Sequence, residues 1–163
     1  MRNGMVDIVP MTAEQLDGVH KVETECFAVP WSRRAFEQEL EKGFQTVYVT
    51  AIDVETRGIV GYGGMWHVVN EGYITNIAVH PDRRKQGIAQ RILDYLVQAA
   101  TEREMIGLTL EVRISNEAAQ RLYTKNGFKP EGIRKNYYAE FNEDAVIMWK
   151  YLIPQEEEVN NDK

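Results

Sequence analysis

Residues 77–91 read IAVHPDRRKQGIAQR, a strand-like segment followed by a turn with proline, a basic loop with glycine and the start of a helix. After Gly87 the apolar residues recur at positions 88, 92, 93, 96 and 97, which predicts a helix with one buried face. The N-terminus of a helix has backbone N–H groups without intrahelical partners and carries partial positive charge. Gly87 would let an anion approach this backbone, and the basic run 83–85 adds positive charge. The pattern predicts a phosphate-binding loop; an ordinary strand-to-helix connection is the alternative.

The length and charge of the chain limit the classes of protein to which it can belong. With 163 residues it has the length of one domain, and its net charge of −6 argues against bulk electrostatic binding to nucleic acid or an anionic membrane. Cys26 is the only cysteine, so an intramolecular disulfide is excluded and a reducing compartment is indicated. No apolar run reaches the length of a membrane span, and no signal peptide is apparent. We expect one cytoplasmic domain over residues 1–153 and an acidic, disordered tail over 154–163.

The rest of the sequence alternates between strand and helix patterns. Strands are expected at 6–9, 46–52, 59–69, 73–79, 108–114, 128–134 and 144–152, and helices at 12–25, 32–40, 87–102 and 116–125. A loop is expected at 135–143. The strand–helix–strand unit over residues 73–114 should contain parallel pairing with a right-handed crossover. The glycines at 61, 63 and 64 do not complete a G-x-G-x-x-G motif, so close packing or bulges explain them better.

Glu111 and Tyr123 form the second group of residues with a chemical interpretation. Alternation along the strand 108–114 places the leucines at 108 and 110 on one face and Glu111 on the other, and Tyr123 follows on the next helix. Beside a thioester, a carboxylate could deprotonate an α-ammonium with a pKa of about 8, and a tyrosine could protonate a thiolate with a pKa of about 8.5. The alternatives are an exposed carboxylate for Glu111 and core packing for Tyr123.

The spacing Arg84-x-x-Gly87-x-Ala89 resembles the acyl-CoA pyrophosphate motif Q/R-x-x-G-x-G/A of the GNAT superfamily of N-acetyltransferases. The chain is also similar to the bacterial RimI family of ribosomal-protein-alanine N-acetyltransferases, over nearly everything except the acidic tail. The matching segments include Ile77-Ala78-Val79, Leu110-Glu111-Val112-Arg113, Ser115-Asn116, Leu122-Tyr123, Gly127-Phe128, Ile133-Arg134-Lys135-Asn136-Tyr137-Tyr138 and the loop Val29-Pro30-Trp31-Ser32. The resemblance implies an α/β (α+β) GNAT fold, with a mixed central sheet of about seven strands flanked by four helices.

The resemblance also implies roles for individual residues. Glu111 would be the proton acceptor and Tyr123 the proton donor. Trp31 with Tyr137 and Tyr138 would flank the substrate's N-terminus, although core packing is the alternative for Trp31 and the tyrosines. The residues implied to bind acetyl-CoA are Ile77, Ala78 and Val79 along the pantetheine, Arg84, Lys85, Gln86, Gly87, Ile88, Ala89 and Gln90 around the pyrophosphate, and Asn116.

By this resemblance, the expected function is transfer of an acetyl group from acetyl-CoA to the N-terminal amine of a ribosomal protein. The resemblance further implies that the acceptor residue is alanine. Cys26 has no paired histidine, so we expect direct attack in a ternary complex and no acyl-enzyme. The histidines lack metal-ligand spacing, and no metal is expected. Two alternatives remain open: an acetyltransferase for a small-molecule amine or a lysine side chain, and a non-catalytic acyl-CoA-binding module. Neither nucleic acid nor a membrane is expected as a direct partner.

Overall fold

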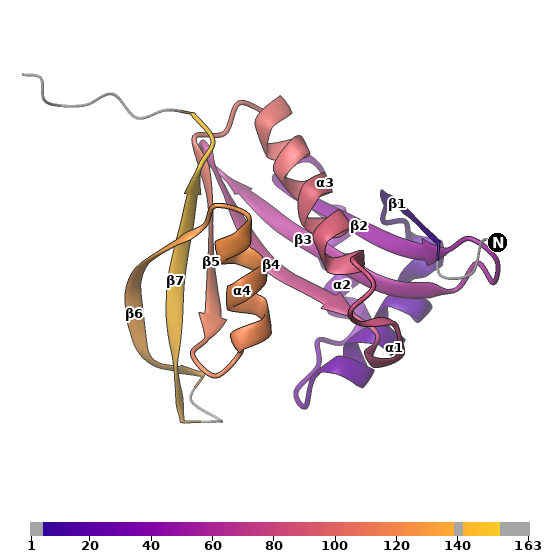
Figure 1. The fold of residues 1–163 in the computed structure, drawn as a ribbon. Coiled ribbons are helices and arrows are strands. Elements are labelled where there is room, and N and C mark those ends of the chain that lie inside the picture. The colour runs from indigo at the N-terminus through magenta and orange to yellow at the C-terminus, as the bar shows by residue number, and fades with distance from the viewer. Residues whose placement is uncertain (1–4, 139–141, 154–163) are drawn as a thin grey trace, which may run out of the picture. The chain divides into compact units, whose positions relative to one another are not determined.

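The computed structural model describes residues 5–138 and 142–153 (Figure 1). The described strands are β1 Val6–Pro10, β2 Thr46–Asp53, β3 Ile59–Val68, β4 Glu71–Val79, β5 Gly107–Arg113, β6 Lys129–Tyr138 and β7 Glu143–Tyr151. The described helices are α1 Leu16–Cys26, α2 Arg33–Glu41, α3 Ile88–Glu102 and α4 Glu117–Lys125. Short 3-10 turns occupy Ala13–Gln15, Gly43–Gln45 and Pro81–Arg83. The expected tail, residues 154–163, lies outside the described residues.

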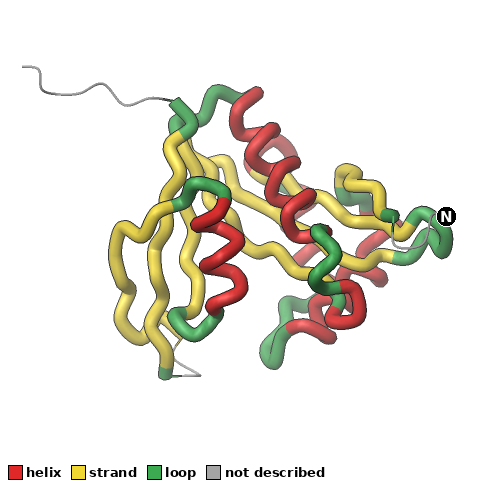
Figure 2. The backbone as a smooth tube through the Cα atoms, in the orientation of Figure 1, coloured by secondary structure: helices red, strands yellow, loops and turns green. Residues whose placement is uncertain are grey.

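The seven strands are hydrogen-bonded in the order β1-β2-β3-β4-β5-β7-β6. The pairs β1–β2, β2–β3, β5–β7 and β6–β7 are antiparallel. α3 follows β4 and precedes β5 along the chain, and the parallel pairing and right-handed crossover expected for this segment stay predictions. Figure 2 colours these strands and helices along the backbone. The expected α/β fold with about seven strands and four helices is confirmed.

The chain divides into two compact units. The first unit comprises Met1–Val68 with Tyr73–Ala99, and the second comprises Val69–Gly72 with Ala100–Lys163. In the first unit α1 and α2 cover one face of the strands. They do so through a core in which Leu16, Val22 and Phe36 are fully buried.

The opposite face of the first unit is covered by α3, and two glycines of β3 allow this packing (Figure 1). A Cβ atom at Gly63 would collide with the side chain of Ile92 on α3. A Cβ atom at Gly61 would lie 2.9 Å from the carbonyl oxygen of Ala78. The close packing expected for these glycines is confirmed.

The second unit contains β5, β7 and β6 with α4. Leu108, Leu110 and Val112 of β5 are buried on one face, as the alternation predicts. The Lys150 ammonium of β7 donates a hydrogen bond of 2.9 Å to the carbonyl oxygen of Asn126, which follows the last turn of α4. The helix and the strands of this unit are therefore tied together at that end.

Most boundaries lie within two residues of the sequence prediction, and two differ by more. The expected loop 135–143 is wrong in its first part, because β6 continues to Tyr138 and pairs there with Glu143. A bulge between Arg134 and Tyr138 makes this possible, with Asn136 at a φ of 52° and its N–H donated to Asp144 Oδ1 at 2.7 Å. The first helix starts at Leu16, later than expected, because residues 13–15 form a 3-10 turn.

Candidate functional site

The predicted phosphate-binding loop connects β4 with α3 in the first unit. Lys85 has a φ of 64° and Gly87 a φ of 82°, and a Cβ atom at Gly87 would meet nothing within 4 Å. The first helical hydrogen bond of α3 runs from the N–H of Arg91 to the carbonyl of Gly87 at 3.1 Å. The N–H groups of Ile88 and Ala89 precede this bond, and the first N–H groups of an α-helix have no acceptor in a preceding turn. The loop therefore has the backbone donors and the open approach that an anion such as a pyrophosphate requires.

The two arginines of this loop contact protein groups. Arg83 forms an ion pair with Asp53 through Nη1 and Oδ2 at 2.7 Å, and its Nε lies 3.1 Å from Gln86 Oε1. Arg84 donates from Nε to the carbonyl of Val79 at 3.1 Å. These contacts fix the loop to the last residue of β2 and to the end of β4. The predicted contact between Arg84 and the pyrophosphate stays a prediction.

Cys26, at the end of α1, packs against the same strand end. Its thiol donates a hydrogen bond of 3.3 Å to the carbonyl of Val79 and lies 3.5 Å from the guanidinium of Arg84. Burial raises the pKa of the Cys26 thiol. A thiol with a raised pKa is a poor nucleophile at neutral pH, in line with the expectation that Cys26 has no catalytic role.

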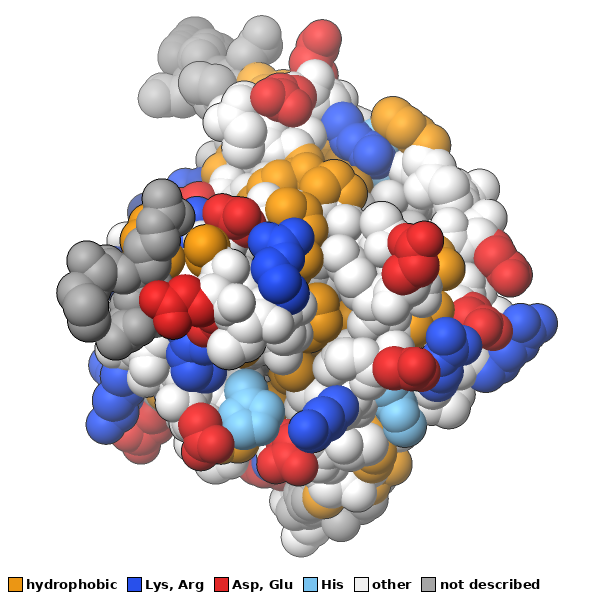
Figure 3. Space-filling view, turned by 90° about the vertical axis from the view of Figure 1, so that its right-hand side faces the viewer, with side chains coloured by type: hydrophobic (Ala, Val, Ile, Leu, Met, Phe, Trp, Pro, Cys, Tyr) orange, Lys and Arg blue, Asp and Glu red, His pale blue; other side chains and the backbone are white. Residues whose placement is uncertain are grey.

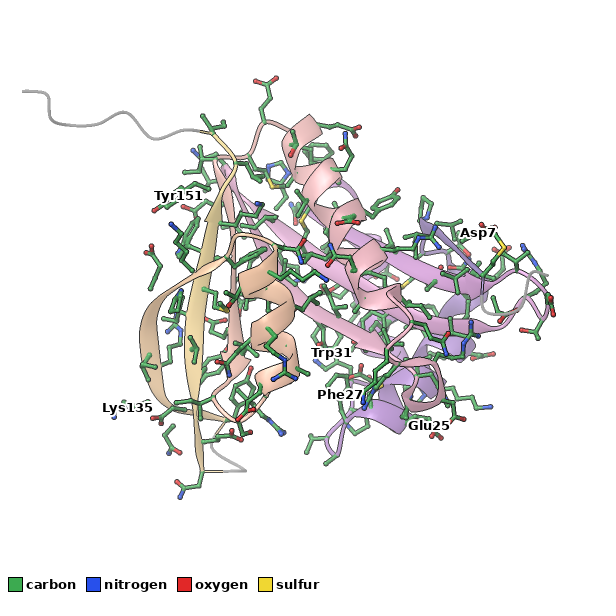
Figure 4. All side chains as sticks on the ribbon, viewed as in Figure 1. Asp7, Glu25, Phe27, Trp31, Lys135 and Tyr151 are labelled. Carbon is green, nitrogen blue, oxygen red and sulfur yellow. The ribbon has the colours of Figure 1, made fainter. Side chains whose placement is uncertain are left out.

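The connection between α1 and α2 carries Trp31, which was predicted to flank the acceptor. Figure 4 labels Phe27 and Trp31 on this connection. The Trp31 ring lies 5.3 Å from the ring of Phe36 in the core, and its backbone N–H donates to Glu23 at 2.9 Å. Val29, two residues earlier, is 63% exposed. Trp31 is therefore packed on the core, as the alternative interpretation anticipated, and its contact with an acceptor stays a prediction.

In the second unit Glu111 lies on β5 with only 6% of its side chain exposed. Its Oε2 accepts a hydrogen bond of 2.7 Å from Nε of Arg134, on β6. Sequence reasoning missed this partner. β7 lies between the two strands, with Glu111 opposite Ile147 and Arg134 opposite Ala145. This register brings the arginine to the carboxylate, and the sequence pattern of the separate strands does not fix it.

Tyr137 and Tyr138 surround the same ion pair. The guanidinium of Arg134 lies 5.8 Å from the ring centre of Tyr137, and that of Arg113 lies 5.6 Å from the ring centre of Tyr138. The Tyr138 hydroxyl donates to the backbone carbonyl of Glu111 at 3.4 Å. Burial raises the pKa of Tyr138 to about 12. The structure thus gathers Tyr137 and Tyr138 around the predicted base; their contact with substrate stays a prediction.

Tyr123 and Asn116 belong to α4 and its cap. Tyr123 is buried, with its ring 5.4 Å from that of Phe128, and burial raises its pKa well above the usual value. Its hydroxyl is therefore protonated at neutral pH. Asn116 caps the helix by accepting a hydrogen bond of 3.1 Å from the N–H of Ala119. The predicted contact of Asn116 with acetyl-CoA stays a prediction.

Further features bear on what the chain could bind. Acidic and basic side chains are interspersed over the face shown in Figure 3. Across residues 5–138 and 142–153, no group of three His, Cys, Asp or Glu side chains is arranged to hold a metal ion. No helix in the described part of the chain has both the length and the apolar character needed to cross a membrane.

Comparison with known proteins identifies the family. The profile of the "Acetyltransferase (GNAT) family" matches residues 16–128. A Bacillus subtilis (strain 168) protein, described as a candidate [ribosomal protein bS18]-alanine N-acetyltransferase, is 40% identical over 140 residues, covering 85% of this chain and 91% of that protein. The Escherichia coli (strain K12) [ribosomal protein bS18]-alanine N-acetyltransferase is 32% identical over 146 residues, covering 88% and 96%.

A solved structure agrees with these sequence matches. The crystal structure of the ribosomal-protein-S18-alanine N-acetyltransferase from Escherichia coli superposes with a TM-score of 0.83 at 30% identity. The match covers 96% of this chain and 100% of that one. The chain belongs to the GNAT family of acetyltransferases.

Proposed function

We propose that the chain transfers the acetyl group of acetyl-CoA to the N-terminal alanine of ribosomal protein bS18, in the cytoplasm. The observation that carries this proposal is the likeness to enzymes with that described activity, which extends over almost their whole length at 32% to 40% identity. The net charge of −6 favours encounter with a basic ribosomal protein. The geometry of each unit supports the chemistry that this reaction needs.

The residues of the first unit fit the pyrophosphate of acetyl-CoA. The positive φ angles of Lys85 and Gly87 turn the loop in front of α3, and the space beside the Gly87 Cα is open. Backbone N–H groups at the start of α3 can donate to phosphate oxygens, and the partial positive charge of the helix N-terminus stabilises them. The ion pair of Arg83 with Asp53 holds this backbone in place.

The second unit supplies the groups that move protons. Acetyl-CoA supplies an acetyl group activated as a thioester. Glu111 would accept the proton of the α-ammonium, directly or through a water molecule, because its carboxylate is fixed by Arg134. Tyr123 would donate a hydrogen bond to the departing thiolate. Since its pKa lies above that of a thiol, transfer of its proton to the thiolate is unfavourable, and Tyr123 would act by stabilising the developing charge through this hydrogen bond.

The test is an acceptor panel with the purified protein and acetyl-CoA. The panel contains a peptide with the N-terminal sequence of bS18, the same peptide with a blocked N-terminus and an added lysine, and spermidine. The proposal predicts that the first peptide is acetylated with the highest kcat/KM. Acetylation of only the lysine peptide or spermidine would refute the acceptor, and binding of acetyl-CoA without turnover on any amine would refute catalysis.

A further inference from the structure

The carboxylate of Glu23 lies at the end of a buried hydrogen-bond chain in the first unit. Glu23 is 2% exposed, and its Oε2 accepts from the backbone N–H of Trp31 at 2.9 Å. Its Oε1 accepts from the hydroxyl of Tyr62 at 2.6 Å. The Tyr62 oxygen in turn accepts from Nδ2 of Asn76 at 3.1 Å, and Oδ1 of Asn76 accepts from the N–H of Ile77 at 3.0 Å. The chain therefore links the α1–α2 connection to β4.

This arrangement requires a carboxylate and cannot be reproduced by an amide. The Trp31 N–H can only donate, so it needs one oxygen. The Tyr62 oxygen already accepts from Asn76, so the Tyr62 hydrogen needs a second acceptor. A glutamine at position 23 offers one oxygen and one NH₂ group, which would leave one of the two buried donors unpaired.

The charge of Glu23 also carries a cost, which makes a purely structural role a poor explanation. The described partners of the Glu23 carboxylate are the Trp31 N–H and the Tyr62 hydroxyl, neither of which is a cation, and burying a carboxylate without a cation is unfavourable. The consequence of burying this carboxylate is that the backbone at Trp31 is fixed by a hydrogen bond. The Trp31 ring packs on Phe36 and the Phe36 ring on Tyr62, both at 5.3 Å, so the side chain and the main chain of Trp31 are anchored to the same core.

We propose that Glu23 is a positioning residue for acceptor recognition, which holds the connection 27–32 in the shape that receives the acceptor amine. The inference rests on the proposed function and on the prediction that Trp31 of this connection flanks the N-terminus of the acceptor. It assigns Glu23 no contact with the reacting atoms. It implies that the exposed Val29 is presented to the acceptor from a backbone that is ordered before the acceptor binds.

Glu39 provides a matched control within the same unit. It is also a helical glutamate, 7% exposed, and Oε1 accepts from the Tyr48 hydroxyl at 2.7 Å and from Trp66 Nε1 at 2.6 Å. Its network also reaches β4, because the Tyr48 hydroxyl lies 3.2 Å from Thr75 Oγ1. None of the described contacts of Glu39 involves the connection 27–32. Unlike Glu23, Glu39 also pairs with a cation, since its Oε2 lies 2.6 Å from Lys42 Nζ. Glu39→Gln therefore makes the same chemical change at another buried helical glutamate of this unit, one that does not contact the connection 27–32.

The experiment measures KM for the acceptor and for acetyl-CoA separately in both variants. Glu23→Gln should raise the acceptor KM by about tenfold, as expected for loss of a hydrogen bond to a charged group, and leave the acetyl-CoA KM within about twofold. Glu39→Gln should change neither KM. Equal acceptor KM values in the two variants, or a rise in the acetyl-CoA KM alone, would overturn the inference.

A second measurement needs no variant. Amide hydrogen exchange at Trp31 should be slow in the free wild-type protein, since Glu23 holds this N–H, and fast exchange there would overturn the inference. Failure of this inference can be distinguished from failure of the proposed function. The acceptor panel on the wild type decides which amine is the substrate, and the comparison of Glu23→Gln with Glu39→Gln is then made on that amine.

Discussion

Substitution of Gly87 by alanine tests the phosphate-binding loop with little steric disturbance. Gly87 has a φ of 82°, and an added Cβ would meet no atom within 4 Å. The intrinsic cost is therefore conformational, about 1–2 kcal/mol for a residue with a Cβ in the left-handed region. Gly43, which opens the 3-10 turn between α2 and β2, has a φ of 61° and equally open surroundings. Gly43→Ala should show the same loss of stability in urea unfolding.

The two variants should differ in their affinity for acetyl-CoA. If the pyrophosphate approaches the backbone at Gly87, the new methyl group occupies that approach. Gly87→Ala should then raise the Kd for acetyl-CoA by about tenfold or more, which corresponds to at least about 1.4 kcal/mol. Gly43→Ala should leave the Kd unchanged in isothermal titration calorimetry. If both variants lose stability equally and bind acetyl-CoA equally well, the assignment of the loop is wrong.

The other predictions concern the second unit and Cys26. Glu111→Gln and Tyr123→Phe should each lower kcat by about 10²–10⁴-fold, with an unchanged Kd for acetyl-CoA. A loss below about threefold would contradict their roles as proton acceptor and as hydrogen-bond donor to the leaving group. Arg134→Gln should lower kcat by about tenfold because the Glu111 carboxylate loses its partner. Lys135, whose side chain is 86% exposed, is the control, and Lys135→Gln should not lower kcat. Equal effects of the two variants would reject a specific role for the ion pair. Cys26→Ser should retain turnover, and the wild type should give intersecting double-reciprocal plots, whereas parallel plots would indicate a covalent intermediate. Burial raises the folded-state pKa of Tyr123, so its stabilising contribution is complete below the unfolded value of about 10 and is lost as pH rises through the folded value. Urea unfolding should show stability falling above about pH 10, and falling less steeply in Tyr123→Phe; an identical fall would show that Tyr123 does not contribute.

The features that follow from local periodicity could be predicted from the sequence. Alternation along residues 108–114 correctly placed the leucines in the core and Glu111 on the other face. Apolar spacing after Gly87 correctly indicated α3. Each of these depends only on neighbours along the chain.

The features that depend on the register between distant strands could not be predicted. The ion pair of Glu111 with Arg134 requires β6, β7 and β5 to align, and a bulge in β6 decides that alignment. The partner of Arg83 could not be predicted either. The Arg83 guanidinium binds Asp53, which lies 30 positions earlier in the sequence. The number of basic residues in this loop is therefore larger than the number of cations available to a phosphate, because Arg83 is paired with a carboxylate.

The site of acetylation on intact bS18 tests the proposed activity most directly. Purified bS18 with a free N-terminal alanine is incubated with this protein and acetyl-CoA, and tandem mass spectrometry locates the acetyl group. The proposal predicts one acetyl group on the α-amine of the alanine. Acetyl groups only on lysine side chains, or unmodified bS18 under conditions in which another amine is acetylated, would contradict it.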